Sequence, residues 1–513
     1  MNTAANSKRV ASNTLFLYIR MLIMMCVTLY TSRVVLDALG VVDYGIYNVV
    51  GGLTVSFAFF ASSLSNATQR FLNIEIGKND SGGVARIYSA SIIIYSVAII
   101  IVLLATEGVG YWILNHSLVI PANRMEAANW VLHTTALGLA LTLIGSIYDS
   151  ILIAYENMKI YAYLSIFETL LRLVAAFVIL HVSFDKLKLY ATLYLASVLI
   201  VRLMTILYCK YRYHDCQFRR IRRYGLIKSI LGFIGWNGLG TAVWMINEQG
   251  VNVLLNIFFG PIVNAARGVA TQVGAAVNNF SNSFFTAIRP QIIKSYNTGE
   301  FDYFYKLIYS GSKYAFFLIW VICLPLILRS SDVLQLWLKE VPEYASSIVQ
   351  WVIIFYCINV LTNPLWSAVQ AVGKLRNYVL IGSIIFLAAF PISYILLKQG
   401  ASPIAVFQTI AITRVVYLAV SVLIVKQLMS FSLKRYIREA IWPIVKIIIL
   451  SGTIAYVLDL CIPNSTLGLM VMTSLSIFAT LIVIYVVGST KSERDVVMSK
   501  IKILTRNVTP NNE

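Results

Sequence analysis

The sequence predicts an all-α polytopic membrane protein with 14 transmembrane helices, and its composition and the length of its apolar runs carry this prediction. Aliphatic, aromatic and cysteine residues make up 59% of the 513 positions, whereas charged residues make up only 12%. The apolar residues form runs of roughly twenty, the length that an α-helix needs to cross about 30 Å of hydrocarbon. A soluble globular protein does not have this composition.

Apolar runs between charged or Gly/Pro-marked breaks define the individual spans. The first eight are 14–36, 44–64, 88–106, 128–153, 162–182, 188–208, 232–258 and 262–287. Six more follow at 311–329, 345–370, 377–397, 403–426, 441–461 and 466–488. Lys8 and Arg9 precede the first run as in a secretory signal, but no small-residue cleavage site follows, so we expect a retained first helix.

The distribution of basic residues predicts the orientation, because basic loops stay on the cytoplasmic side. Of the 41 Lys and Arg residues, 28 fall on the side of the two termini and 7 on the opposite side, counting those at span ends with the adjacent loop. Both termini are therefore expected in the cytoplasm. Topology and attraction to lipid headgroups explain the net charge of +19, so no nucleic-acid partner is needed.

A weak internal repeat divides the chain into two halves. The segment "LGVVDYGIYNVVGG" and the later "ATQRFLNIEIGKND" correspond to "FFGPIVNAARGVATQVG" and "TAIRPQIIKSYNTGE", so that Gly40 matches Gly260 and Arg70 matches Arg289. An even number of crossings per half makes the repeats parallel, related by a pseudo-two-fold axis along the membrane normal. The predicted parts are an N-terminal six-helix lobe (1–210), a basic cytoplasmic linker (211–230), a C-terminal six-helix lobe (231–430), two further helices (431–490) and a cytoplasmic tail (491–513).

Amide side chains are concentrated in the seventh and eighth predicted helices. Unpaired amides in hydrocarbon are costly, so they must meet partner helices or a hydrated lumen. Interhelical hydrogen bonding accounts for some of them, and a lumen able to bond a hydroxyl-rich cargo accounts for the rest. The candidate sugar contacts are Asn237, Asn247, Asn252, Asn256, Gln272 and Asn278.

Arginine at membrane depth must be hydrated, paired or bound to an anion, because it does not lose its charge. Arg20 and Arg202 either face the lumen or snorkel to the cytoplasmic headgroups. Arg414 lies near mid-depth with no acidic neighbour within one turn, whereas the i,i+4 spacing pairs Glu168 with Arg172. Six basic residues in the spans against two internal acids predict a net positive cavity, with Arg20, Arg202, Arg267 and Arg414 as candidate phosphate ligands.

Movement of cargo needs an energy source, and the intramembrane acids are the candidates for coupling to H⁺ or Na⁺. Burial of Glu248 at mid-span favours its protonated form. Glu168 and Asp149 are the further candidates for ion coupling. No P-loop, zinc-protease motif or nucleophile elbow occurs, so we expect no ATP use, no cofactor, no metal and no enzymatic activity.

With its two repeated motifs and its spans, the chain resembles the polysaccharide transporter branch of the multidrug/oligosaccharidyl-lipid/polysaccharide (MOP) exporter superfamily, and within it the Wzx-type O-antigen or capsule-repeat flippases. The resemblance implies a MATE-like fold in the bacterial inner membrane. It implies a flippase that moves undecaprenyl-pyrophosphate-linked oligosaccharide to the periplasmic leaflet by alternating access, with a polysaccharide polymerase as a partner. Relatives that flip a peptidoglycan precursor concentrate arginines in helices 1 and 8. Arg20 and Arg267 match those positions, and Cys26 stands near the place of a second helix 1 arginine.

Two other functions stay open at this stage. An ion-coupled multidrug exporter of the same fold should show a net acidic cavity for cationic drugs, which the internal charges oppose. A membrane-integral polysaccharide polymerase or ligase would need a sizeable outer loop for its chemistry. The longest predicted outer loop has only about twenty residues, near 107–127.

Overall fold

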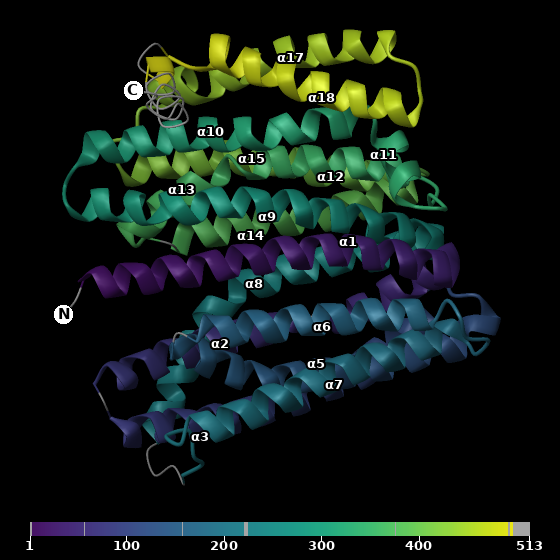
Figure 1. Ribbon diagram of the computed structural model, residues 1–513, viewed down its shortest axis with the longest axis vertical. Helices are drawn as coiled ribbons and strands as arrows, with labels where there is room; N and C mark the ends of the chain where they lie inside the picture. Colours follow the sequence, from purple (N-terminus) through teal and green to yellow (C-terminus); the bar gives the residue numbers. More distant parts are fainter. Residues whose placement is uncertain are drawn as a thin grey trace, which may run out of the picture. The chain divides into compact units, whose positions relative to one another are not determined.

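A computed structural model describes residues 3–55, 57–78, 80–155, 157–219, 224–374, 376–490 and 493–495, and these are almost entirely helical (Figure 1). The elements are α1 (Thr3–Val55), α2 (Ala58–Gly77), α3 (Ser81–Ala105), α4 (Tyr111–His116), α5 (Met125–Ala154), α6 (Met158–Val178), α7 (Lys186–Arg212), α8 (Tyr224–Phe259), α9 (Pro261–Asn297), α10 (Phe301–Leu328), α11 (Ser330–Trp337), α12 (Ala345–Asn359), α13 (Thr362–Val372), α14 (Arg376–Lys398), α15 (Ile404–Leu428), α16 (Leu433–Tyr436), α17 (Trp442–Cys461) and α18 (Thr466–Val483). Short π-helical turns extend α3, α16 and α18.

The described residues form two compact units. Unit 1 comprises Met1–Gln272, Leu338–Ala345 and Phe386–Val406, and unit 2 comprises Val273–Trp337, Ser346–Ile385 and Phe407–Glu513. These units are groups of residues in mutual contact, whereas the lobes 1–210 and 231–430 are defined by the repeat. The lobe boundaries therefore stay a prediction.

Eleven helical stretches of the described chain are long and apolar enough to cross a membrane. Side chains such as Leu104, Leu207 and Leu467 are at least 66% exposed, which suits a surface that faces acyl chains. The fold is therefore all-α and polytopic, and the count of 14 spans stays a prediction.

Two glycines that the sequence pairs across the repeat both have a positive φ angle. Gly40 has φ 75° and Gly260 has φ 72°. The first interrupts α1 and the second separates α8 from α9. Glycine is the residue that adopts this left-handed geometry without strain from a Cβ atom. The matched turns support the correspondence that the two sequence motifs predict.

The motifs expected as loops are helical. Residues 67–77 belong to α2, and most of 286–300 belongs to α9, which extends to Asn297. The predicted outer loop 107–127 is likewise largely helical, with a π-helical turn over Thr106–Gly110 followed by α4. Hydropathy locates the apolar part of a helix, and these helices continue beyond it with polar sequence.

Unit 1 is built on α5, which packs against α7, α2 and α3, while α1 packs against α6. Leu72, Tyr95 and Leu143 are fully buried in one core cluster, and Ile46 and Leu132 in another. Because acyl chains are as apolar as leucine, close packing rather than exclusion of water stabilises these contacts.

At one end of unit 1, Arg124 joins three helices. Its guanidinium group donates to Asp43 of α1 at 2.5 and 2.8 Å and to Asp185 at 2.8 and 3.1 Å. Asp185 also caps α7 by accepting from the backbone N–H groups of Leu187 and Lys188. One arginine therefore ties the start of α5 to α1 and α7 with charge-assisted hydrogen bonds.

Unit 2 has an aromatic core on α10, in which Tyr309 lies 5.3 Å from Phe431 and 6.0 Å from Tyr436 between ring centroids. In Figure 1, α17 and α18 run side by side, and both pack against α10. At the end of α10, the Arg329 side chain is only 4% exposed. It donates to the backbone oxygens of Asp459 (3.1 Å) and Ile462 (2.8 Å) and forms ion pairs with the carboxylates of Asp332 (3.0 Å) and Asp459.

Glu493 attaches the segment after α18 to α10. Its carboxylate accepts from the Lys313 ammonium at 2.8 and 2.9 Å and from the backbone N–H of Thr490 at 2.7 Å. Burial raises the pKa of Glu493, but Lys313 and the Thr490 N–H outweigh it and lower this pKa to about 2.

We expect this contact to stabilise the protein above pH 4.5, the ordinary pKa of the carboxyl, and to be lost as the pH falls toward 2. A lowered folded-state pKa means that the folded state prefers the ionised form, so acid removes the stabilisation. The difference in thermal unfolding midpoint between the parent and Glu493→Gln should therefore be constant above pH 4.5 and vanish near pH 2. A difference that stays unchanged over this range would contradict the assignment.

Candidate functional site

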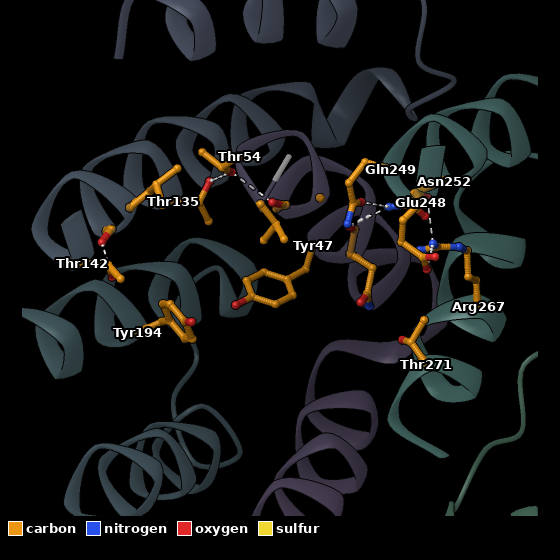
Figure 2. Close-up of a pocket in the computed structure, with 16 residues that line it drawn as sticks. Tyr47, Thr54, Thr135, Thr142, Tyr194, Glu248, Gln249, Asn252, Arg267 and Thr271 are labelled. Carbon is orange, nitrogen blue, oxygen red and sulfur yellow. Dashed lines mark hydrogen bonds and ion pairs between the residues drawn. The ribbon is translucent and has the colours of Figure 1, made fainter. Parts of the chain in front are cut away.

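A polar cavity in unit 1 has a volume of about 340 Å³ (Figure 2), and we call it the larger cavity because a second cavity in this unit is smaller. Five helices line it: α1, α5, α7, α8 and α9. The lining residues are Tyr47, Asn48, Gly51, Gly52, Thr54, Val55, Thr135, Gly138, Leu139, Thr142, Tyr194, Glu248, Gln249, Asn252, Arg267 and Thr271. Its wall is therefore made of hydroxyl, amide and aromatic groups with one cation and one anion.

Arg267 and Glu248 form an ion pair in this cavity. The Arg267 Nη2 atom lies 2.5 Å from Glu248 Oε1 and donates to the Glu248 backbone oxygen at 2.8 Å. The Arg267 side chain is 9% exposed, whereas that of Glu248 is 38% exposed. Figure 2 shows the pair beside Asn252. The cavity is formally neutral in its described lining, so the predicted excess of positive charge is not found here.

Small residues of α1 allow the amides of α8 to reach the cavity. A Cβ atom on Gly52 would lie 2.5 Å from Gln249 Oε1 and 2.7 Å from Asn252 Nδ2, which is closer than real contacts allow. The Asn252 amide donates to the Asn48 backbone oxygen at 3.1 Å. Glycine at this position therefore lets the two helices approach until their polar groups meet.

Threonines of α5 and α9 present oxygen atoms to the cavity. The Thr142 hydroxyl donates to the Gly138 backbone oxygen at 2.9 Å, and that of Thr271 donates to the Gly268 oxygen at 2.8 Å. A hydroxyl that donates within its own helix keeps lone pairs free to accept another hydrogen bond. Thr135 and Thr142 are seven residues apart on α5 and so share one helix face. This wall suits a ligand rich in hydroxyl donors.

Tyrosines form the aromatic part of the wall. Tyr47 lies edge-on to Tyr190 with 5.0 Å between ring centroids, and 6.5 Å from Tyr194. Tyr47 and Tyr194 line the cavity (Figure 2). Rings of this kind offer an apolar face together with a polar tip.

A smaller cavity of about 250 Å³ in unit 1 contains a cluster of four charged side chains. Arg202 forms ion pairs with Asp149 at 2.9 Å and with Glu168 at 3.3 Å, and Glu168 also pairs with Arg172. Gly145 makes room for Arg202, since a Cβ there would lie 2.1 Å from Arg202 Cδ. We call Asp149, Glu168, Arg172 and Arg202 the charge cluster.

The charge cluster confirms one expected contact: the Glu168–Arg172 pair expected from i,i+4 spacing is present. Arg202, predicted as a phosphate ligand or a snorkelling residue, pairs with Asp149 and Glu168, two acids that were predicted to couple ions. Arg202 and Asp149 are 53 residues apart in the sequence, so their contact could not be predicted from local spacing. The phosphate and ion-coupling roles of these residues stay predictions.

Arg414 is held by polar and aromatic neighbours of unit 2. Its Nη2 atom donates to Thr362 Oγ1 at 2.9 Å and to the Asn359 side chain. Its guanidinium carbon lies 4.8 Å from the ring centroid of Tyr417, a cation–π distance. Arg414 is 8% exposed. Its role as a phosphate ligand stays a prediction. The side chain of Arg20 lies outside the described residues.

Of the amides predicted to contact sugar, Asn252 lines the larger cavity. Asn256 is fully buried: it donates to Asn264 at 3.0 Å and accepts from the Val119 N–H at 2.7 Å. Asn256 therefore links α8 to α9 and to the backbone at Val119, and its role as a sugar contact stays a prediction.

The other predicted amides lie elsewhere. Asn247 is 8% exposed, with an Oδ1 atom that has no hydrogen bond within the described structure. Gln272 and Asn278 are half-buried in α9, and Gln272 is absent from the described lining of the larger cavity. The side chain of Asn237 lies outside the described residues.

Sequence reasoning missed several lining residues, among them Tyr47, Thr135, Thr142 and Tyr194. Threonine and tyrosine are common in membrane helices, so their type alone carries no signal. Their spacing was the available signal: Thr135, Gly138 and Thr142 place small or polar groups on one face of an otherwise apolar helix.

No protein-family model matches the chain, and no curated protein matches it in sequence. Solved structures with a similar fold include the following three. "Lipid II flippase MurJ, inward closed conformation" has a TM-score of 0.73 at 14% identity, covering 92% of this chain and 98% of that one. An inward-facing multidrug resistance MATE family transporter of the MOP superfamily has a TM-score of 0.65 at 16% identity, covering 80% and 97%. A mutant of the Vibrio cholerae MATE transporter VcmN has a TM-score of 0.57 at 16% identity, covering 83% and 97%. The chain therefore has the fold shared by MurJ and the MATE transporters of the MOP superfamily.

Proposed function

We propose that the chain is a flippase that moves a lipid-linked oligosaccharide, of the undecaprenyl-pyrophosphate class, from the cytoplasmic to the periplasmic leaflet. The observation that carries the proposal is the lining of the larger cavity. It combines threonine oxygens, amides and tyrosine rings, which suit sugar hydroxyls and sugar faces, with a single arginine for an anionic group. The solved structures that share this fold include a lipid II flippase and a multidrug resistance transporter, which supports transport rather than catalysis as the activity of this chain.

The cargo is expected to divide between water and lipid. Its oligosaccharide enters the larger cavity, and its pyrophosphate competes with Glu248 for Arg267. The polyprenyl chain stays in the bilayer, because moving a long apolar chain through a polar cavity would cost roughly 0.8 kcal/mol per CH₂ group. The other predicted phosphate ligands, Arg20 and Arg414, remain part of the proposal.

Ion coupling is assigned to Glu248 and to the charge cluster. A carboxylate that releases Arg267 when cargo binds becomes an unpaired charge and gains affinity for H⁺ or Na⁺. Cargo binding and ion binding at Glu248 are then linked. Asp149 and Glu168, both paired with Arg202, provide a second place where a proton changes the charge balance.

The proposal is tested with the full-length protein in liposomes that contain a polyprenyl-pyrophosphate-linked oligosaccharide on one leaflet. Headgroup accessibility to an added glycosidase reports transfer to the other leaflet, with and without a proton or sodium gradient. Protein-dependent transfer of unaltered glycolipid supports the flippase. Efflux of a cationic dye without glycolipid transfer would favour the multidrug exporter, and lengthened glycan would favour the polymerase or ligase.

Thr142→Val should slow glycolipid transfer by about 2- to 10-fold, because valine keeps the shape and removes one hydrogen bond worth about 0.5–1.5 kcal/mol. Thr453→Val on α17 is the matched control. The Thr453 hydroxyl makes the same kind of bond to its own helix, to the Ile449 oxygen at 2.8 Å, but it is exposed. Equal effects of the two substitutions would contradict a cargo contact at Thr142.

A further inference from the structure

Arg172 of α6 lies between the smaller cavity and a residue that lines the larger cavity. Its side chain lines the smaller cavity, where it pairs with Glu168. Its guanidinium carbon lies 4.4 Å from the ring centroid of Tyr194, and Tyr194 lines the larger cavity. One side chain therefore links the charge cluster to the proposed cargo site.

The contacts of Arg172 depend on charge and on a ring face. Its Nε atom is buried and has no hydrogen-bond partner within the described structure, so this donor does not fix the group to the backbone. Its guanidinium group forms an ion pair with Glu168 and a cation–π contact with Tyr194. Loss of the Glu168 charge would therefore alter the position of the Arg172 guanidinium group over the Tyr194 ring.

The charged surroundings of Glu168 come from three of the helices that line the smaller cavity. Helix α7 contributes Arg202, α5 contributes Asp149, and α6 contributes Arg172 and Tyr161. From α1, the described lining residue is Met24, which does not titrate. Protonation of Glu168 would leave two guanidinium groups facing the one carboxylate of Asp149.

We propose that Arg172 is a positioning residue that transmits the protonation state of Glu168 to the ring of Tyr194 in the larger cavity. When Glu168 is ionised, its carboxylate holds Arg172 at the ring. When Glu168 takes up a proton, that ion pair is lost and the guanidinium group is redistributed toward Asp149, which changes the wall that the cargo meets. By linkage, cargo that displaces Tyr194 changes the proton affinity of Glu168 by the same factor. This inference rests on the proposed function only in taking the larger cavity as the cargo site.

The test places 4-trifluoromethyl-phenylalanine at position 194 of the full-length protein in lipid nanodiscs and records the ¹⁹F signal without cargo from about pH 4 to about pH 9, a range that covers carboxyl and histidine titration. The signal should titrate in this parent. Glu168→Gln should fix it near its low-pH position, and Arg172→Met should abolish the titration. Arg172→Lys keeps the charge but not the planar group, so it should reduce the amplitude. Glu107→Gln removes an exposed carboxylate that pairs with His133, and it should leave the titration unchanged.

A signal that does not titrate in the parent, or that titrates unchanged in Glu168→Gln or Arg172→Met, would overturn the inference. Because this measurement uses no cargo, a failed flipping assay does not affect it. In the liposome assay, Arg172→Met should retain transfer while its pH dependence is lost. If the parent protein shows the expected ¹⁹F titration but transfers no glycolipid at any pH, the result counts against the proposed function alone.

Discussion

Replacing Arg267 with glutamine should reduce transfer of an anionic glycolipid by about 10- to 100-fold, because a hydrogen bond to a charged group contributes about 1.5–3 kcal/mol. The substitution also leaves Glu248 as an uncompensated acid in the larger cavity. Binding of a cationic dye should therefore rise as glycolipid transfer falls. Both readouts are measured on the same proteoliposomes.

The matched variants are Glu248→Gln and the double variant. Glu248→Gln frees Arg267 from its internal partner, so glycolipid binding should be retained or tightened while the dependence of transfer on an ion gradient is lost. The double variant restores a neutral cavity and should lose the dye binding seen with Arg267→Gln alone. If Arg267→Gln transfers glycolipid at the parent rate, the cargo contact at this residue is wrong.

Replacing Arg329 with methionine should cost about 3–5 kcal/mol of unfolding free energy, the range for breaking a buried ion pair. The substitution leaves the Asp459 and Asp332 carboxylates without their partner and unties the end of α10 from the turn between α17 and α18. Denaturant unfolding in detergent micelles measures the change.

Lys339→Met is the control for this effect. Lys339 pairs with Asp37 at 2.6 Å, but its side chain is 64% exposed, and an exposed pair contributes only about 0–1 kcal/mol. Both substitutions remove a cation from an ion pair, but Arg329 is buried and also donates to the backbone oxygens of Asp459 and Ile462, so its loss should cost more. Equal losses of stability would show that the burial of Arg329 does not matter.

The fold class was predictable because hydrocarbon imposes a length and an apolarity on every span. The boundaries of the individual helices were less predictable. Span 14–36 and most of span 44–64 belong to one helix, α1, that is interrupted at Gly40, because a change of direction at glycine leaves no trace in hydropathy. The end of span 44–64 belongs to the start of α2. Residues after the second and eighth predicted spans also continue as helix. Hydropathy does not detect this, because polar sequence is compatible with a helix outside the membrane.

The candidate site was predictable only where partners lie one turn apart. The spacing of Glu168 and Arg172 indicates their contact, but Arg202 meets Asp149 across 53 residues, and Glu248 meets Arg267 across the turn at Gly260. Asn256 and Asn252 have the same residue type and neighbouring helix positions, yet one is an internal link and the other lines the cavity. Residue type indicates what a side chain is able to bind, whereas tertiary packing decides what it does bind.

Site-specific photo-crosslinking tests most directly whether the larger cavity holds the glycolipid. A benzoylphenylalanine at position 142 or 249 of the full-length protein should crosslink to a labelled polyprenyl-pyrophosphate oligosaccharide through its sugar, and excess unlabelled glycolipid should suppress the reaction. The same group at the outward-facing Leu207 should capture no sugar. Sugar adducts that form equally at all three positions, or only at position 207, would contradict the assignment of this cavity to the cargo.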